Sequence, residues 1–116
     1  MNFLGDGVVK IQERDWKLFR EKLPLWQENY IGRLNGEYIA ILQKPTNASE
    51  NFWELEKRIR NDKRNFGVSA RISRNNMFQI VVSLLANAVI TIDDLKDFSD
   101  EFTEAVNFCI KNITSK

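Results

Sequence analysis

Histidine is absent from the sequence, and its absence excludes several kinds of catalytic and metal site. There is no imidazole to act as a general base, no Ser-His or Cys-His dyad, and no histidine ligand for zinc. The 5 glycines are scattered and form neither a Walker loop nor a Gly-x-Gly-x-x-Gly turn, so no glycine-rich loop can hold a phosphate. We therefore expect a protein that is not an enzyme and that needs no cofactor or metal.

Cysteine is scarce, because Cys109 is the one cysteine and cannot form a disulfide within the chain. This usage fits a reducing compartment. On the apolar face of a predicted helix, Cys109 is expected to pack as a small hydrophobic side chain. Residues 1–10 have no basic region and only brief apolar pairs, so they do not read as a signal peptide. We expect a cytoplasmic protein.

The chain also lacks an excess of one charge, since 17 basic and 16 acidic side chains leave a net charge of +1. No strong overall field therefore draws the protein to nucleic acid or to anionic lipid. Residues 75–92 form the longest uncharged stretch, but their amide and hydroxyl side chains would be costly in lipid. We interpret this stretch as part of a buried helix and expect no membrane partner.

Apolar side chains at helical spacing are what the sequence does contain, and they predict an all-α fold. We expect one domain over residues 1–116, a compact bundle of four to five helices with residues 1–10 as a poorly ordered N-terminal arm. The predicted helices cover residues 13–23, 26–42, 49–64, 70–88 and 99–112. Pro24 should break or sharply kink the chain between the first two, because proline disfavours the α conformation of the residue before it. The helix near residues 70–88 is the most apolar and should be central.

Residues 30–42 allow two interpretations. The asparagine and glycine at 35 and 36 lie between two apolar runs, a pattern typical of a β-hairpin with a type I′ turn. As a helix, residues 26–42 place their large apolar side chains on one face. Burying these can exceed the cost of about 1 kcal/mol for each of Gly32 and Gly36. We favour the helix.

Several polar residues are placed to begin or end these helices. Asn47 or Ser49 can cap the third helix, and Asn47 and Glu50 have the spacing of a capping box. Ser99 can cap the last helix. Asp93 can cap the short turn before it, and Gly67 is a candidate stop for the third helix.

The densest set of carboxylates could in principle hold a metal ion. It consists of Asp93, Asp94, Asp97, Asp100, Glu101 and Glu104. The set lacks the glycine and the alternating oxygen ligands of an EF-hand loop, and its members occupy caps and first helical turns, where the helix dipole favours negative charge. A metal-dependent enzyme that uses residues 93–104 is therefore a distant alternative.

A basic segment, residues 57–74, is the feature that indicates a binding partner. Its candidate interaction residues are Lys57, Arg58, Arg60, Lys63, Arg64, Phe66, Arg71 and Arg74. Such a segment can grip phosphates, with the phenylalanine stacking on a base. It can also be a solvated face that Glu54 and Glu56 partly neutralise.

The tryptophans at positions 16, 26 and 53 lie on or next to helical stripes, so we expect core packing for each. An exposed tryptophan would be the natural anchor of a protein contact. Our first hypothesis is a non-catalytic protein-protein interaction or regulatory role, as a homodimer or as an inhibitor of a bacterial or phage partner. The alternative is a nucleic-acid-binding module that uses residues 57–74.

Several stretches resemble a group of short helical proteins of Gram-positive bacteria. These stretches are residues 13–20 (ERDWKLFR), 26–30 (WQENY), 52–56 (FWELE), 94–95 (DL) and 98–101 (FSDE). Members of the group are sometimes labelled multidrug transporter, but that label requires a membrane span, which the sequence lacks. The resemblance implies a small helical cytoplasmic protein, favours the helix over residues 26–42, and implies no activity or site residue.

Overall fold

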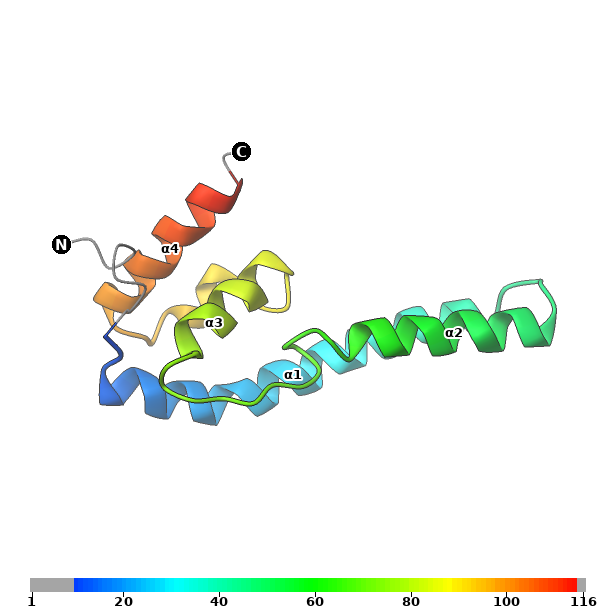
Figure 1. Ribbon diagram of the computed structural model, residues 1–116, viewed down its shortest axis with the longest axis horizontal. Helices are drawn as coiled ribbons and strands as arrows, with labels where there is room; N and C mark the ends of the chain where they lie inside the picture. The colour runs from blue at the N-terminus through cyan, green and yellow to red at the C-terminus, as the bar shows by residue number, and fades with distance from the viewer. Residues whose placement is uncertain (1–9, 115–116) are drawn as a thin grey trace. The chain divides into compact units, whose positions relative to one another are not determined.

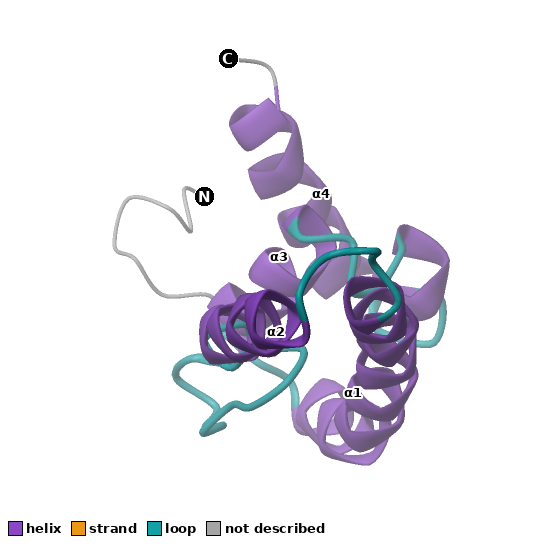
Figure 2. Cartoon of the chain, turned by 90° about the vertical axis from the view of Figure 1, so that its right-hand side faces the viewer, coloured by secondary structure: helices purple, strands orange, loops and turns teal. Residues whose placement is uncertain are grey.

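The computed structural model describes residues 10–114, and within that range helices are the only regular secondary structure (Figures 1 and 2). Their bounds are α1 Glu13–Leu42, α2 Ala48–Asp62, α3 Met77–Ala86, the 3₁₀ helix η1 Ile92–Leu95, and α4 Asp100–Thr114. The predicted all-α fold is therefore confirmed. Most of the predicted N-terminal arm, residues 1–9, lies outside the described residues. Among the described helices, none combines the length and the hydropathy that crossing a bilayer requires.

The chain divides into two compact units, which we name by their composition. The terminal unit contains the residues up to Pro24 and those from Arg71 onward, and so includes the start of α1, α3, η1 and α4. The hairpin unit, Leu25–Ala70, contains the rest of α1 and all of α2.

Helix α1 runs through Pro24 without interruption, so the predicted break into two helices is wrong. Leu23 and Trp26, on either side of the proline, are buried, whereas Pro24 itself is exposed. Burial of two large side chains offsets the roughly 3 kcal/mol that a proline costs inside a helix. The carbonyl that loses its donor belongs to Arg20, an exposed residue, where water can bond it. The helical interpretation of residues 26–42 is confirmed.

Helix α3 is the most deeply buried helix of the terminal unit. Met77, Ile80, Val81 and Leu84 are each at most 1% exposed. On α4, the aromatic ring of Phe102 packs edge-on against Phe78 of α3, with ring centroids 5.9 Å apart. The remaining buried apolar residues of this unit include Phe19, Val89, Ile90, Leu95, Phe98, Ala105 and Val106. The predicted central role of this apolar helix is confirmed within its own unit.

Helix α3 is shorter than the helix predicted over residues 70–88. The side chain of Asn76 donates to the Arg71 carbonyl at 2.8 Å and accepts the Ser73 amide at 2.8 Å. These bonds give the backbone an alternative to the helical pattern, which delays the start of α3. At the other end of the helix, Ala88 has a φ of 58°, in the left-handed region. The Val89 amide donates to the Leu84 carbonyl at 2.8 Å, and this bond ends the helix.

The capping predictions for the C-terminal region are half right. Ser99 caps α4, because its Oγ accepts the Phe102 amide at 3.2 Å. The prediction that Asp93 caps the short turn is wrong: Thr91 is the N-cap of η1 and forms a capping box with Asp94. The Thr91 amide donates to the Asp94 carboxylate at 2.7 Å.

The third predicted helix also differs at its ends. Asn47 is the N-cap residue of α2, but its side chain makes no cap bond to the backbone and instead donates to Glu50 at 3.3 Å. Helix α2 ends at Asp62, so Gly67 is not its stop. The Gly67 amide donates to the Asn65 side chain at 2.7 Å within the following turn.

In the hairpin unit, α2 runs alongside the second part of α1 (Figures 1 and 2). The loop over residues 43–47 that joins them is held by buried Asn51, whose amide donates to the Lys44 carbonyl at 3.1 Å and whose Oδ1 accepts from Thr46. Because this polar side chain is satisfied by the loop backbone, it fixes where α2 starts against α1.

Candidate interaction surface on helix α2

The contact between α2 and α1 includes a polar cluster of side chains. The Tyr38 hydroxyl donates to the Asp62 carboxylate at 2.7 Å. Arg58 donates to the same carboxylate through Nε at 2.9 Å and reaches Glu37 of α1 through Nη2. Its guanidinium also lies 5.8 Å from the centre of the Tyr38 ring. This cluster of four side chains holds the two helices of the hairpin together.

The electrostatics of the cluster favour one protonation state. Burial, followed by the hydrogen bond to Asp62, raises the pKa of Tyr38 to about 12. The hydrogen bond to Glu37 raises the pKa of Arg58 above its ordinary value, against the opposing effect of burial. The phenol and the guanidinium therefore keep their protons at neutral pH. Arg58, one of the candidate interaction residues, is engaged inside the hairpin.

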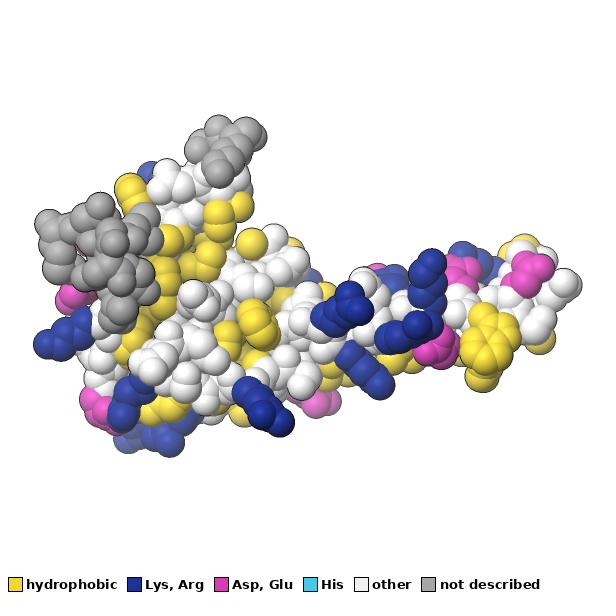
Figure 3. All heavy atoms as spheres, in the orientation of Figure 1, with side chains coloured by type: hydrophobic (Ala, Val, Ile, Leu, Met, Phe, Trp, Pro, Cys, Tyr) yellow, Lys and Arg dark blue, Asp and Glu magenta, His cyan; other side chains and the backbone are white. Residues whose placement is uncertain are grey.

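The outward side of α2 carries a different set of residues, which we call the basic stripe. It consists of Trp53, Lys57, Arg60 and Arg64, spaced by four, three and four residues, so that they follow one helical face. Arg64 lies just past the helix, in a turn that bonds its amide to the Asn61 carbonyl at 3.2 Å. On the face drawn in Figure 3, Lys and Arg side chains gather over α2.

Trp53 is the most unusual member of the stripe, because 62% of its surface is exposed. The expectation of core packing is therefore wrong for Trp53, while Trp26 is buried and Trp16 is partly buried. The Phe52 ring packs edge-on against the Trp53 indole, with ring centroids 4.9 Å apart and an angle of 87° between the ring planes. Trp53 comes one residue after Phe52 and shares a helical face with Lys57 and Arg60, a spacing that could have indicated its exposure from sequence.

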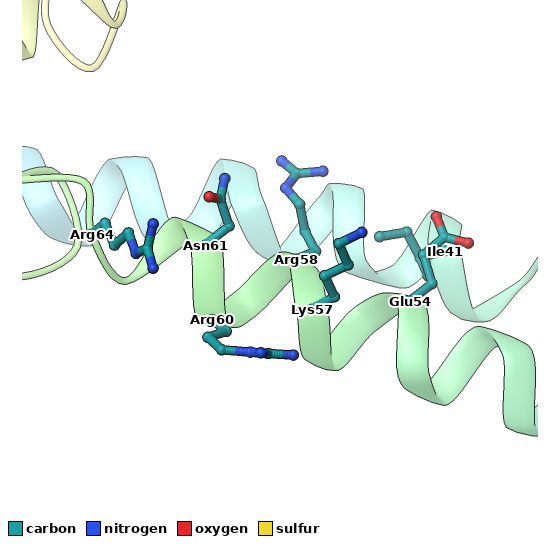
Figure 4. A pocket seen from close by; sticks show the side chains of 7 residues that line it. All are labelled: Ile41, Glu54, Lys57, Arg58, Arg60, Asn61 and Arg64. Carbon is teal, nitrogen blue, oxygen red and sulfur yellow. The ribbon is translucent and has the colours of Figure 1, made fainter.

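A cavity of about 450 Å³ opens along α2 beside the basic stripe (Figure 4). Its lining residues are Ile41, Glu54, Lys57, Arg58, Arg60, Asn61 and Arg64. The Glu54 carboxylate already forms an ion pair with the Lys44 ammonium group at 2.6 Å. The Arg60 guanidinium likewise pairs with the Glu56 carboxylate at 2.7 Å. No carboxylate of the described residues pairs with Lys57 or Arg64. The cavity therefore offers positive charge that the hairpin itself does not neutralise.

The other predicted interaction residues are placed differently. Phe66 is 36% exposed in the turn after α2, where its carbonyl accepts the Gln27 side chain at 2.9 Å. Arg71 and Arg74 belong to the terminal unit. There Arg74 binds Glu13 and lies 5.7 Å from the centre of the Trp16 ring. The basic segment of the sequence is thus divided between the two units.

A second groove, of about 420 Å³, follows a neighbouring face of α2. We call this face the apolar stripe, and its lining residues are Phe52, Leu55, Glu56, Ile59, Arg60 and Lys63. Phe52 is 59% exposed, and Leu55 and Ile59 are partly exposed. The side chain of Lys63 has no carboxylate partner among the described residues. The residues that the structure describes therefore cover this apolar face of α2 only in part.

The acidic cluster does not converge on one point. Asp94 belongs to the capping box of η1, Asp97 pairs with Lys22 at 3.5 Å, and Glu101 accepts from Gln12 at 3.4 Å. Asp100 lies in the first turn of α4. Within residues 10–114, no three side chains of the kinds that ligate metals come together.

An apolar groove of about 470 Å³ lies between α3 and α4 in the terminal unit, lined by Phe78, Val82, Ala86, Cys109 and Ile113 among others. Burial raises the pKa of the Cys109 thiol, which keeps it protonated and slow to react. The groove offers no charged side chain, and its polar lining residues are Gln79, Ser83 and Asn112.

Comparison of the chain with family models, with curated proteins and with solved structures gives no match.

Proposed function

We propose that this chain is a cytoplasmic, non-catalytic protein-interaction protein that binds an acidic segment of a partner through the basic stripe of α2. The observation that carries the proposal is the exposed Trp53 on the same helical face as two cations, Lys57 and Arg64, without carboxylate partners. Tryptophan and arginine contribute more binding energy to protein interfaces than most residue types do.

Two side chains of the basic stripe are preorganised by contacts within α2. Phe52 packs edge-on against the indole of Trp53, and this contact lowers the side-chain entropy that the indole loses on association. Arg60 is already oriented by Glu56 through an ion pair one turn earlier. An acidic partner with one apolar side chain for the indole would match both the charge and the shape of this face.

Binding of nucleic acid is the alternative that the same cations support. Neutralising several phosphates releases counterions, so that binding weakens steeply with salt. A contact anchored by Trp53 would depend on salt much less, since burial of the indole does not involve a charge. The near-neutral charge of the chain, +1, favours the protein partner.

The test is affinity capture from native lysate with the full chain as bait. We expect the double variant Trp53→Ala, Arg64→Glu to lose a partner that the wild-type chain retains at physiological salt. Lys96→Glu, an exposed charge reversal in the terminal unit, is the matched control and should retain it. Equal recovery of every partner by the double variant and the control would refute the proposal, and capture of nucleic acid alone would favour the alternative.

A further inference from the structure

The groove between α3 and α4 leaves apolar side chains of both helices in contact with solvent. Val82 of α3 and Cys109 of α4 are partly exposed, and Ile113 of α4 is 52% exposed. None of the residues that line the groove is charged. Covering apolar surface of this kind is favourable, because it removes that surface from water. The occupant that fits this groove is therefore an uncharged, apolar segment.

Residues 1–9 of the chain have that composition. Phe3 and Leu4 form one apolar pair, residues 8–9 form a second, and Asp6 is the one charged side chain among the nine. Burial of Phe3 and Leu4 in the groove would desolvate no charge on either side of the contact. The sequence of residues 1–9 therefore matches the chemistry of the groove.

The described part of the chain begins beside α4, in the same unit as the groove. The Gln12 side chain donates to the carboxylate of Glu101, in the first turn of α4, at 3.4 Å. Each helical residue turns by about 100°, so Asn112, eleven residues further on, lies within about 20° of Glu101 around the helix. Cys109 lies about 80° from Glu101 by the same measure. A chain that continues from Gln12 along this face of α4 therefore arrives at the groove.

The segment is also long enough to reach the groove. From Glu101 to Asn112 the distance along α4 is about 16 Å, at a rise of about 1.5 Å per residue. The eight residues from Leu4 to Gln12 can span up to about 26 Å when extended. The tether keeps Leu4 near the groove at an effective concentration on the order of millimolar, so a contact of modest area is sufficient to hold it.

We propose that residues 1–9 occupy the groove between α3 and α4. The side chains of Phe3 and Leu4 pack there beside Cys109 and cover the apolar surface that the two helices leave exposed. The groove is then filled by a segment of the same chain, and any apolar ligand or partner must displace that segment before it can bind.

Disulfide formation with Cys109, the one cysteine of the chain, tests the contact. With oxidised glutathione as the oxidant, Leu4→Cys should form a disulfide within the chain, which mass spectrometry of the non-reduced peptides identifies. Asp6→Cys is the matched control, because a cysteine two residues away in an undocked segment would close a loop at nearly equal entropy cost. We expect Leu4→Cys to link about tenfold faster than Asp6→Cys. Equal rates, or a disulfide mainly between two chains at low protein concentration, would overturn the proposal.

The reactivity of Cys109 with an aromatic disulfide reagent gives a second measurement. Replacing both anchors, in Phe3→Ser, Leu4→Ser, should open the groove and raise the reaction rate about fivefold or more. Asn2→Ser changes a polar side chain of the same segment and should leave the rate as it is in the wild-type chain. The same rate in all three chains would show that residues 1–9 do not cover Cys109.

Far-ultraviolet circular dichroism of each variant verifies that the helices remain folded. All of these substitutions lie outside α2, so capture of a partner through the basic stripe is tested independently of the groove. Selective linking without any captured partner would support the groove contact alone. Capture that depends on Trp53 and Arg64, together with equal linking rates, would support the basic stripe and overturn the groove contact.

Discussion

The carboxylate of Asp15 accepts two hydrogen bonds from Ser99, one from the amide at 2.8 Å and one from the hydroxyl at 2.6 Å, although the two residues are 84 positions apart. Asp15 is 1% exposed, and the same Ser99 hydroxyl oxygen accepts the Phe102 amide at the start of α4. One buried carboxylate thereby fixes the first turn of α1 against the N-terminus of α4.

Removing this carboxylate should destabilise the terminal unit. Asp15→Ala leaves the Ser99 amide buried without an acceptor, and we expect a loss of about 3 kcal/mol in the free energy of unfolding. Urea denaturation followed by circular dichroism measures it. Asp93→Ala, at an exposed aspartate of η1, is the control and should cost less than about 0.5 kcal/mol. Equal stabilities of the two variants would show that the Asp15–Ser99 bonds contribute nothing.

Replacing Ala88 by glycine should stabilise the end of α3. Ala88 has a φ of 58°, which is strained for a residue with a Cβ and relaxed for glycine. We expect Ala88→Gly to raise the free energy of unfolding by about 0.5–1 kcal/mol. Ala40→Gly, at an exposed position inside α1, should lower it by about 1 kcal/mol. Thermal melts of both variants should shift in opposite directions, and a lower melting temperature for Ala88→Gly would contradict the assigned backbone.

Replacing Gly36 by alanine should stabilise the chain, because this glycine lies at a position where the backbone is helical. It lies inside α1, and a Cβ built there meets no atom within 4 Å. Gly36→Ala should therefore stabilise the helix by about 1 kcal/mol. The outcome also tests the helical conformation of residues 30–42, because the type I′ turn of a hairpin would need a positive φ at this position and alanine would destabilise it. Chemical denaturation of the variant and the wild-type chain decides the sign.

Tyr38 should make stability depend on alkaline pH. A tyrosine in the unfolded chain has a pKa of 10.0, whereas Tyr38 in the folded chain holds its proton to about 12. Between these values the folded state binds more protons than the unfolded state, so this contribution is complete below pH 10 and is lost as the pH rises towards 12. The free energy of unfolding of Tyr38→Phe should fall less over that range than that of the wild-type chain.

Absorbance titration at 295 nm provides an independent check. The chain has 2 tyrosines, so in Tyr38→Phe only Tyr30 titrates. The difference between the wild-type and variant curves is then the titration of Tyr38. A midpoint of that difference near 10 would show that the bond to Asp62 and the surrounding burial do not hold the proton.

Local pattern was enough to identify most helices and some of their ends. The spacing of Leu34 and Ile41 is helical across Gly36, and the structure has a helix there. Ser99 was identified as a cap because serine before a helical pattern has few other roles. The candidate site was predicted less well. The basic segment predicts Arg58 as an interaction residue, but its partners Glu37 and Tyr38 come from another helix. Helical spacing does not reveal a partner across a hairpin.

The sequence by itself determined that the chain is helical, because the periodicity of its apolar residues and its polar caps act within a few positions of each other. Tertiary structure decided three other features. Pro24 stays inside α1 because residues on both sides of it are buried, and Asp15 is buried because Ser99 is present to bond it. Trp53 is exposed because α2 turns the face that carries Arg58 and Asp62, and not the face of Trp53, toward α1. Each depends on residues far apart in the sequence, whose meeting costs chain entropy and is decided by the balance of the whole fold.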